Sequence, residues 1–186
     1  ESFVEFAHKI ADLALTVNSM DELRATTIDG ISFDEKIAEQ VARIGEKLDV
    51  KAFETLEADA VVPYIHAGNK IGVLVALNKN ANDKINAIGR DVAMQVAAMN
   101  PIAVSESGVP AEVVAREKDI AVDKAKADGK PENIVEKIAE GSVKKYLKEN
   151  TLVNQAFVKD GKKTVSQVVA EVESGLEVVN FTRVSL

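Results

Sequence analysis

The residue with the clearest potential for chemistry is His66, in the segment YIHAGNKIGVLVALN that spans residues 64–78. It precedes a Gly-Asn turn signal at residues 68–69 and a strand with apolar residues at alternate positions. An imidazole both donates and accepts hydrogen bonds on a flat, partly apolar ring, which suits insertion between the elements of a partner. Two interpretations stay open from the pattern alone: a polar residue at the mouth of a loop, or a contact residue for a partner.

Familiar catalytic and cofactor motifs are missing elsewhere in the sequence. There are no cysteines and only two histidines, too few for a typical zinc site without carboxylates that no motif singles out. Residues 161–164, Gly-Lys-Lys-Thr, lack the order and the upstream glycine of a phosphate-binding loop and predict a turn before a helix. The acidic residues at 112–123 are typical of a solvated helix face. The sequence predicts no catalytic residue, no metal site and no cofactor.

The composition suits one acidic domain, or one domain with an inserted element. The 186 residues carry a formal net charge of −7, and 46% are hydrophobic although only 4% are aromatic. The acidic balance disfavours nucleic acids and anionic membranes as partners, because these attract clustered Lys and Arg. No apolar run approaches the roughly 20 residues that span a bilayer, and the amphipathic start is unlike a signal peptide. A chain without cysteine fits the cytoplasm. Because it begins at Glu1 rather than Met, we expect a domain cut from a longer protein.

The first half of the chain predicts helices followed by a hairpin. Apolar residues recur at three- and four-residue steps over 2–17, which predicts an amphipathic helix with Phe3 in its stripe. Ser19 with Glu22, and Ser32 with Glu35, are capping boxes that open two further helices. Residues 49–66 are predicted as extended, 71–77 as a strand covered on both faces, and 85–99 as a helix that ends before Pro101.

The second half predicts a helical hairpin between two parts of one sheet-containing unit. Residues 111–128 and 131–149 are charge-rich helices joined by Asp-Gly-Lys-Pro. They carry narrow apolar stripes that we expect to face each other: Val113, Val114, Ile120 and Ala121 against Ile134, Ile138, Val143 and Leu147. A capping box of Thr164 and Gln167 opens another helix, and residues 176–186 are predicted as a strand. If this strand pairs with 71–77, the hairpin is an insertion in an α+β core.

Several stretches together resemble bacterial elongation factor Ts, the guanine nucleotide exchange factor family for elongation factor Tu. They are YIHAGNKIGVLVALN, DVAMQVAAMNP, GKPENIVEKIAEGSVKKYLKENTLVNQAFVKD and KTVSQVVAEV, in the family's order and spacing. A weaker similarity extends from the first helix through RIGEKLDVKAF to the end, so the resemblance covers nearly the whole chain.

The resemblance implies an α+β fold with a two-part core of helices on small antiparallel sheets and an inserted antiparallel coiled-coil hairpin. Residues 1–58 would end the N-terminal half of the core, 59–109 and 150–186 would form the C-terminal half, and 110–149 the coiled coil. It also implies partner contacts on elongation factor Tu. His66 matches a histidine that touches the G domain, Ile44 and Gly45 match a short contact segment, and Phe157 and Val158 match an apolar loop facing the β-barrel domains.

Such a factor acts by binding, so the resemblance implies a protein that is not an enzyme and needs no cofactor. The chain departs from the family pattern at Lys159 and in lacking the Thr-Asp-Phe-Val-Ala motif, which is expected upstream of Glu1. The small N-terminal module and a helix after Leu186 are missing as well. We therefore expect this chain to exchange nucleotide poorly by itself.

Two other classes of function remain as alternatives. The first is a scaffold or dimerisation module, in which the narrow stripe of the hairpin pairs with a second copy across a two-fold axis. The second is an enzyme with a site made only of Asp, Glu, Lys, Ser or Thr, for which no motif is present.

Overall fold

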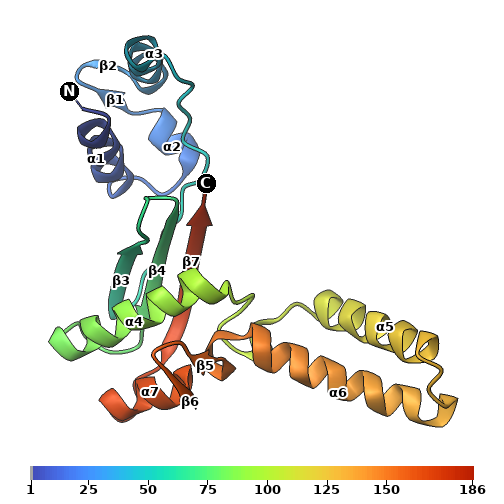
Figure 1. Ribbon diagram of the computed structural model, residues 1–186. Coiled ribbons are helices and arrows are strands. Elements are labelled where there is room, and N and C mark those ends of the chain that lie inside the picture. Colours follow the sequence, from blue (N-terminus) through green and yellow to red (C-terminus); the bar gives the residue numbers. More distant parts are fainter. Residues whose placement is uncertain (1) are drawn as a thin grey trace. The chain divides into compact units, whose positions relative to one another are not determined.

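The computed structural model describes residues 2–186. The chain forms two units, and the first spans residues 1–55. It contains helices α1 (Phe3–Ala14), α2 (Met20–Arg24) and α3 (Phe33–Ile44), with the two-residue strands β1 (Thr27–Ile28) and β2 (Ile31–Ser32) between α2 and α3 (Figure 1). The predicted capping box at Ser32 is present, because its hydroxyl accepts from Glu35 and the Glu35 carboxylate accepts from the Ser32 amide. At Ser19 only half of the predicted box forms, since the Glu22 side chain accepts from Asn18 instead.

Four buried side chains form the core of this unit: Phe6, Leu23, Ile28 and Phe33. Helix α1 is shorter than predicted, and Phe3, which we placed in its buried stripe, is 54% exposed. The β1–β2 hairpin was not predicted, although its Asp-Gly turn at residues 29–30, with φ of +55° and +86°, is a recognised hairpin signal.

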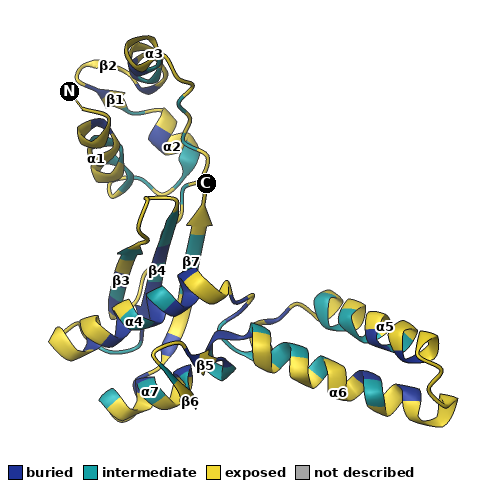
Figure 2. Cartoon of the chain, viewed as in Figure 1, coloured by how far each residue is buried: buried dark blue, intermediate teal, exposed yellow. Residues whose placement is uncertain are grey.

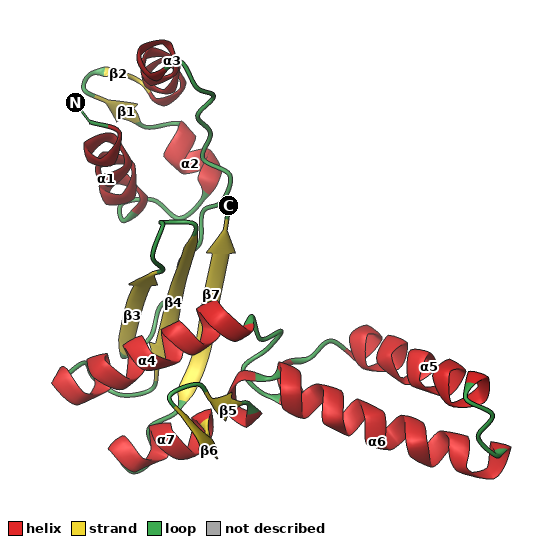
Figure 3. Cartoon of the chain, in the orientation of Figure 1, coloured by secondary structure: helices red, strands yellow, loops and turns green. Residues whose placement is uncertain are grey.

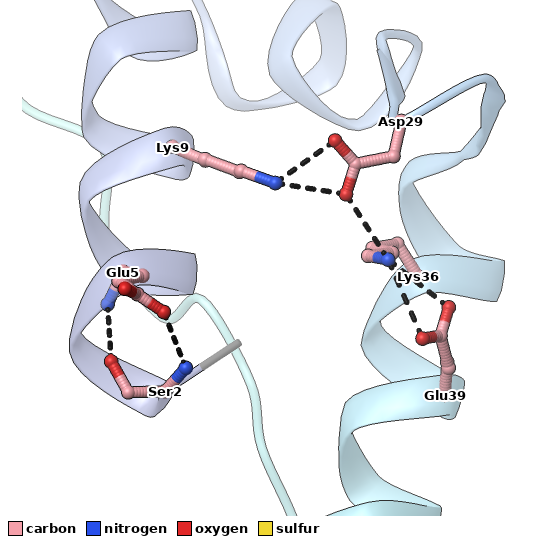
Figure 4. Close-up of polar contacts among 6 residues, drawn as sticks. All are labelled: Ser2, Glu5, Lys9, Asp29, Lys36 and Glu39. Carbon is pink, nitrogen blue, oxygen red and sulfur yellow. Dashed lines mark hydrogen bonds and ion pairs between the residues drawn. The ribbon is translucent and has the colours of Figure 1, made fainter.

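A chain of ion pairs joins α1, the β1–β2 turn and α3 (Figure 4). The Lys9 ammonium lies 2.9 Å from both carboxylate oxygens of Asp29, and Lys36 lies 3.2 Å from Asp29 and 3.2 Å from Glu39. Hydrogen bonds from Lys9 and then Lys36 lower the pKa of Asp29, and hydrogen bonds to Asp29 and Glu39 raise the pKa of Lys36. The Asp29 carboxylate thus ties together three elements of the unit.

The second unit, residues 56–186, is built on a three-stranded antiparallel sheet of order β3 (Ala60–Ile65), β4 (Ile71–Leu77) and β7 (Val178–Ser185). Helix α4 (Asp83–Met99) packs across one face of this sheet (Figure 3). Val73, Val75 and Leu77 alternate toward that face and are buried, while Ala76 on the other face is also buried and Leu74 half-buried. The predicted pairing of the closing strand with β4 is confirmed.

The core of the second unit is completed by α7 (Val165–Val172) and the small hairpin of β5 (Ala156–Phe157) and β6 (Asp160–Thr164). The predicted capping box of Thr164 and Gln167 is present at the start of α7. The β5–β6 hairpin was not predicted, and only Ala60–Ile65 of the predicted extended segment 49–66 forms a strand.

Helices α5 (Ala111–Ala127) and α6 (Glu132–Asn150) form the predicted hairpin, which extends away from the sheet of its unit (Figure 1). Short 3₁₀ turns flank it: η1 (Glu106–Gly108) before α5 and η2 (Leu152–Asn154) after α6. The segments entering and leaving the hairpin are bonded side by side, because Ile102 donates to Asn150 and Leu152 donates to Ala103. The α+β fold with an inserted helical hairpin is therefore as predicted.

The contact between α5 and α6 differs from the predicted stripe. Figure 2 shows buried positions along both helices of the hairpin. They are Ala121, which the predicted stripe contained, and Ala125, Val135 and Ala139, which it did not, whereas Ile120 is 53% and Ile134 38% exposed. Alanine permits the two helix backbones to approach closely, which moves the larger isoleucines to the flank of the seam. The predicted stripe was therefore right for Ala121 and wrong for Ile120 and Ile134.

Candidate partner-binding surface

His66 lies at the start of the turn that joins β3 to β4, and its backbone is fixed on both sides. The His66 amide donates to the carbonyl of Ile71 at 2.9 Å, and the His66 carbonyl accepts from the Asn69 amide at 3.0 Å. Gly68 and Asn69 hold φ of +87° and +55°, the left-handed region that glycine and asparagine tolerate best. The imidazole is exposed and lies one residue beyond the end of β3.

The His66 ring has an aromatic neighbour in Tyr64, two residues earlier in β3. The Tyr64 hydroxyl lies 3.1 Å from Nδ1 of His66, and the two ring centres are 6.1 Å apart with planes at 55°. Ile65, between them in sequence, points to the opposite face and is 63% exposed. Sequence reasoning missed Tyr64, although residues two apart on a strand share a face and this spacing could have revealed it.

The predicted apolar loop at Phe157 and Val158 divides into a buried and an exposed residue. Val158 is 49% exposed in the turn between β5 and β6, but Phe157 is only 4% exposed and belongs to the core of the second unit. Alternation along the short strand directs the Phe157 ring inward, and its contact with a partner stays a prediction.

Gln95 of α4 positions this turn. Its side chain is fully buried; Nε2 donates to the carbonyl of Ala156 and to Oε1 of Gln155, both at 3.1 Å, while Oε1 accepts from the Val158 amide at 2.8 Å. Nearby, Lys159 pairs with Asp91 of the same helix at 2.6 Å. The sequence signal for Gln95 was a polar residue beside Val92 and Val96 on the apolar face of a helix.

Ile44 and Gly45 belong to the first unit, where they end α3. Ile44 is 37% exposed, and Gly45 closes the helix with φ of +80° while its amide donates to the Val41 carbonyl at 2.8 Å. The other three predicted residues lie in the second unit, and there the β3–β4 turn and the β5–β6 hairpin stand toward opposite ends of the sheet (Figure 1). Within that unit the structure does not gather His66 and Val158 into one cavity.

Residues 2–186 offer no basis for two other kinds of site, a metal centre and a membrane-spanning helix. Among these residues, no three side chains of His, Cys, Asp or Glu are grouped so that they could hold a metal ion. None of the helices in this described part combines the length and apolar character needed to cross a bilayer.

Comparison with known proteins assigns the family. The sequence model of the family described as Elongation factor TS matches residues 1–186. The chain belongs to the elongation factor Ts family. It is 45% identical over 186 residues to elongation factor Ts of Christiangramia forsetii, covering 100% of this chain and 68% of the relative. It is 46% identical to that of Amoebophilus asiaticus, covering 98% of this chain and 66% of the relative.

A third relative, elongation factor Ts of Flavobacterium psychrophilum, is 45% identical over 186 residues, which are 100% of this chain and 68% of that protein. The chain thus spans about two thirds of the length of these elongation factor Ts proteins. Membership of this family places the chain among translation elongation factors.

Proposed function

We propose that the chain is part of a guanine nucleotide exchange factor for elongation factor Tu. The observation that carries this proposal is the match of the elongation factor Ts family over residues 1–186. In this role the chain works in the cytoplasm, makes and breaks no covalent bond, and is therefore not an enzyme. We also propose the four-part division into residues 1–58, 59–109, 110–149 and 150–186, with the α5–α6 hairpin as an inserted coiled coil.

In the proposed complex, the contacts come from three positions whose backbone is held by hydrogen bonds. His66 presents an exposed imidazole from the end of β3, and Val158 presents an exposed isopropyl group from a turn clamped by Gln95. Ile44 and Gly45 contribute the exposed end of α3. Phe157, which precedes Val158, is buried in the core, and its contact with the partner stays a prediction. Preorganised positions of this kind lower the entropy lost on binding.

Exchange by such a protein requires a difference in affinity between two states of the GTPase. The factor must bind nucleotide-free elongation factor Tu more tightly than the GDP-bound form, so that its binding disturbs the phosphate and Mg²⁺ site. Linkage then requires that the factor weaken GDP by the same ratio by which GDP weakens the factor. A ratio of 100 corresponds to a coupling free energy of about 2.7 kcal/mol.

Calorimetric titration of the chain into both forms of elongation factor Tu tests the proposal. We expect tighter binding to the nucleotide-free form, and a GDP affinity that falls by the same ratio when the chain is present. Equal affinities for the two forms would refute the exchange role, because a ligand without preference shifts no equilibrium.

His66→Ala tests the proposed contact, with His8→Ala as its matched control. Both histidines are exposed, but His8 lies on α1 of the first unit and has no proposed role. We expect His66→Ala to weaken binding to nucleotide-free elongation factor Tu about tenfold, the effect of losing an interface residue worth about 1.4 kcal/mol. The thermal midpoints of both variants should remain near that of the wild type. Equal binding by the two variants would argue against His66 as a contact.

A second candidate is self-association through the helical hairpin. The exposed Ile120 lies with Ile138 and Tyr146 along a shallow groove of about 400 Å³ on one side of α5 and α6, rimmed by charges of both signs. A second copy could cover this apolar strip across a two-fold axis. Light scattering of wild type and Ile120→Lys would test it: a dimer that the substitution dissociates supports this role, and a monomeric wild type at high concentration excludes it.

A further inference from the structure

Tyr64 and His66 form a pair in which one residue is anchored and the other is free to meet a partner. Tyr64 lies in β3 and His66 follows Ile65, the last residue of that strand, so the two side chains are two residues apart and lie on the same side of the chain. Tyr64 is half-buried and packs against the main core, where it shares a row of the sheet with Val73 of β4 and Arg183 of β7. His66 is exposed, and the structure gives its ring a hydrogen bond to the Tyr64 hydroxyl at 3.1 Å.

Because the Tyr64 hydroxyl contacts Nδ1 of His66, Nε2 is the ring nitrogen that is left to meet a partner. A neutral imidazole carries its proton on one ring nitrogen, and the other nitrogen accepts. A phenol O–H is a strong donor, whereas its ring-conjugated oxygen is a weak acceptor, so the 3.1 Å contact favours donation from Tyr64 to Nδ1. The proton of the neutral imidazole then resides on Nε2, because a ring nitrogen that accepts a hydrogen bond cannot also carry the proton.

We propose that Tyr64 is a positioning residue that holds His66 in the Nε2–H tautomer and presents this N–H outward as a hydrogen-bond donor. The partner group that fits such a donor is an exposed carbonyl or carboxylate oxygen. The importance of this donor for exchange rests on the function proposed above, but the tautomer itself does not. Fixing the ring before binding removes one side-chain rotation that the complex would otherwise have to restrict.

Nitrogen NMR of the imidazole rings tests the tautomer directly, because the chain has only two histidines. At mildly alkaline pH, two-bond proton–nitrogen spectra should show His66 with Nε2 protonated and Nδ1 accepting, while exposed His8 serves as the averaged reference. Tyr64→Phe keeps the packed ring and removes only the hydroxyl. We expect its His66 signals to move toward the averaged pattern of His8. Averaged signals for His66 in the wild type, or protonation on Nδ1, would overturn the proposal.

A binding measurement separates this inference from the proposed function. Tyr64→Phe should weaken binding to nucleotide-free elongation factor Tu by about threefold to tenfold, the range expected from one hydrogen bond. If His66→Ala weakens binding but Tyr64→Phe does not, the positioning role is refuted. If neither variant changes binding while the tautomer responds to Tyr64→Phe, the tautomer stands and His66 as a contact fails. An unchanged thermal midpoint in Tyr64→Phe would confirm that folding is not the cause.

Discussion

Gly89 in α4 is the position where the structure makes the sharpest prediction about stability. A Cβ added there would lie 2.5 Å from Cγ2 and 3.0 Å from Cβ of Val62, and 3.1 Å from Cδ1 of Leu77. Both neighbours are buried on the sheet face that α4 covers. Val62 is β-branched and its Cβ cannot rotate away, so Gly89→Ala forces the helix and the sheet apart.

The expected magnitude is the difference between two opposing effects. Overpacking a core by one methyl group costs about 1–3 kcal/mol, and a contact of 2.5 Å belongs in the upper part of that range. Replacing glycine by alanine inside a helix gains about 0.8–1.0 kcal/mol. We therefore expect Gly89→Ala to lower the free energy of unfolding by about 1–2 kcal/mol.

Gly141→Ala in α6 is the matched control, because it makes the same change in a helix without the same neighbours. A Cβ at Gly141 meets no atom within 4 Å, so only the helix propensity changes, and stability should rise by about 0.5–1 kcal/mol. Urea unfolding of the wild type and both variants, followed by circular dichroism with the m-value compared, measures the two effects. The two substitutions should shift stability in opposite directions.

A stabilised Gly89→Ala variant would refute the argument that α4 approaches the sheet this closely. The double variant Val62→Ala/Gly89→Ala gives a second check, because removing both methyl groups of Val62 removes the closest contact. The cost of Gly89→Ala in unfolding free energy should be smaller in that background than in the wild type. Equal costs in the two backgrounds would mean that the two sites are independent and would contradict the contact.

Two further predictions concern the polar contacts of the two units. Gln95→Ala should lower the free energy of unfolding by about 2–4 kcal/mol, since it removes a buried side chain with three hydrogen bonds. Lys159→Ala, which breaks an ion pair near the surface, should cost less than about 1 kcal/mol in the same urea titration. Equal losses would contradict the role of Gln95 in holding the β5–β6 turn. Because Lys9 and Lys36 lower the pKa of Asp29, its stabilising effect is present above the ordinary carboxyl value of about 3.9 and is lost as pH falls through the lowered folded value. Asp29→Asn should therefore flatten the acid decrease of the thermal midpoint below about pH 4, and an unchanged slope would count against this role.

Elements with strong local signals were predictable from the sequence. The capping boxes at Ser32 and Thr164 open helices α3 and α7 where predicted, because a cap satisfies backbone donors within four residues and needs no distant partner. Gly129, with φ of +70° in the connection between α5 and α6, is likewise a local signal, because glycine tolerates this conformation at the end of a helix. The helical hairpin and the strand at residues 71–77 followed from periodicity.

Periodicity and capping signals did not predict the short β1–β2 and β5–β6 hairpins. Strands β1, β2 and β5 have only two residues each and so no measurable period, and the pairing of such short strands is stabilised by what packs around them. The Asp-Gly pair at residues 29–30 could have indicated β1–β2. For β5–β6 the decisive residue is Gln95, which is 60 residues away from Gln155 in sequence.

By itself, the sequence determined the family, the α+β fold, the inserted hairpin and the exposed histidine before the Gly-Asn turn. Each depends on local propensity, periodicity or a continuous motif. Only the tertiary structure decided that Phe157 is buried, that three alanines and Val135 rather than Ile120 are buried between the hairpin helices, and that Tyr64 contacts Nδ1 of His66. These outcomes depend on which atoms meet when distant segments pack at close range, and a one-dimensional pattern does not contain those distances.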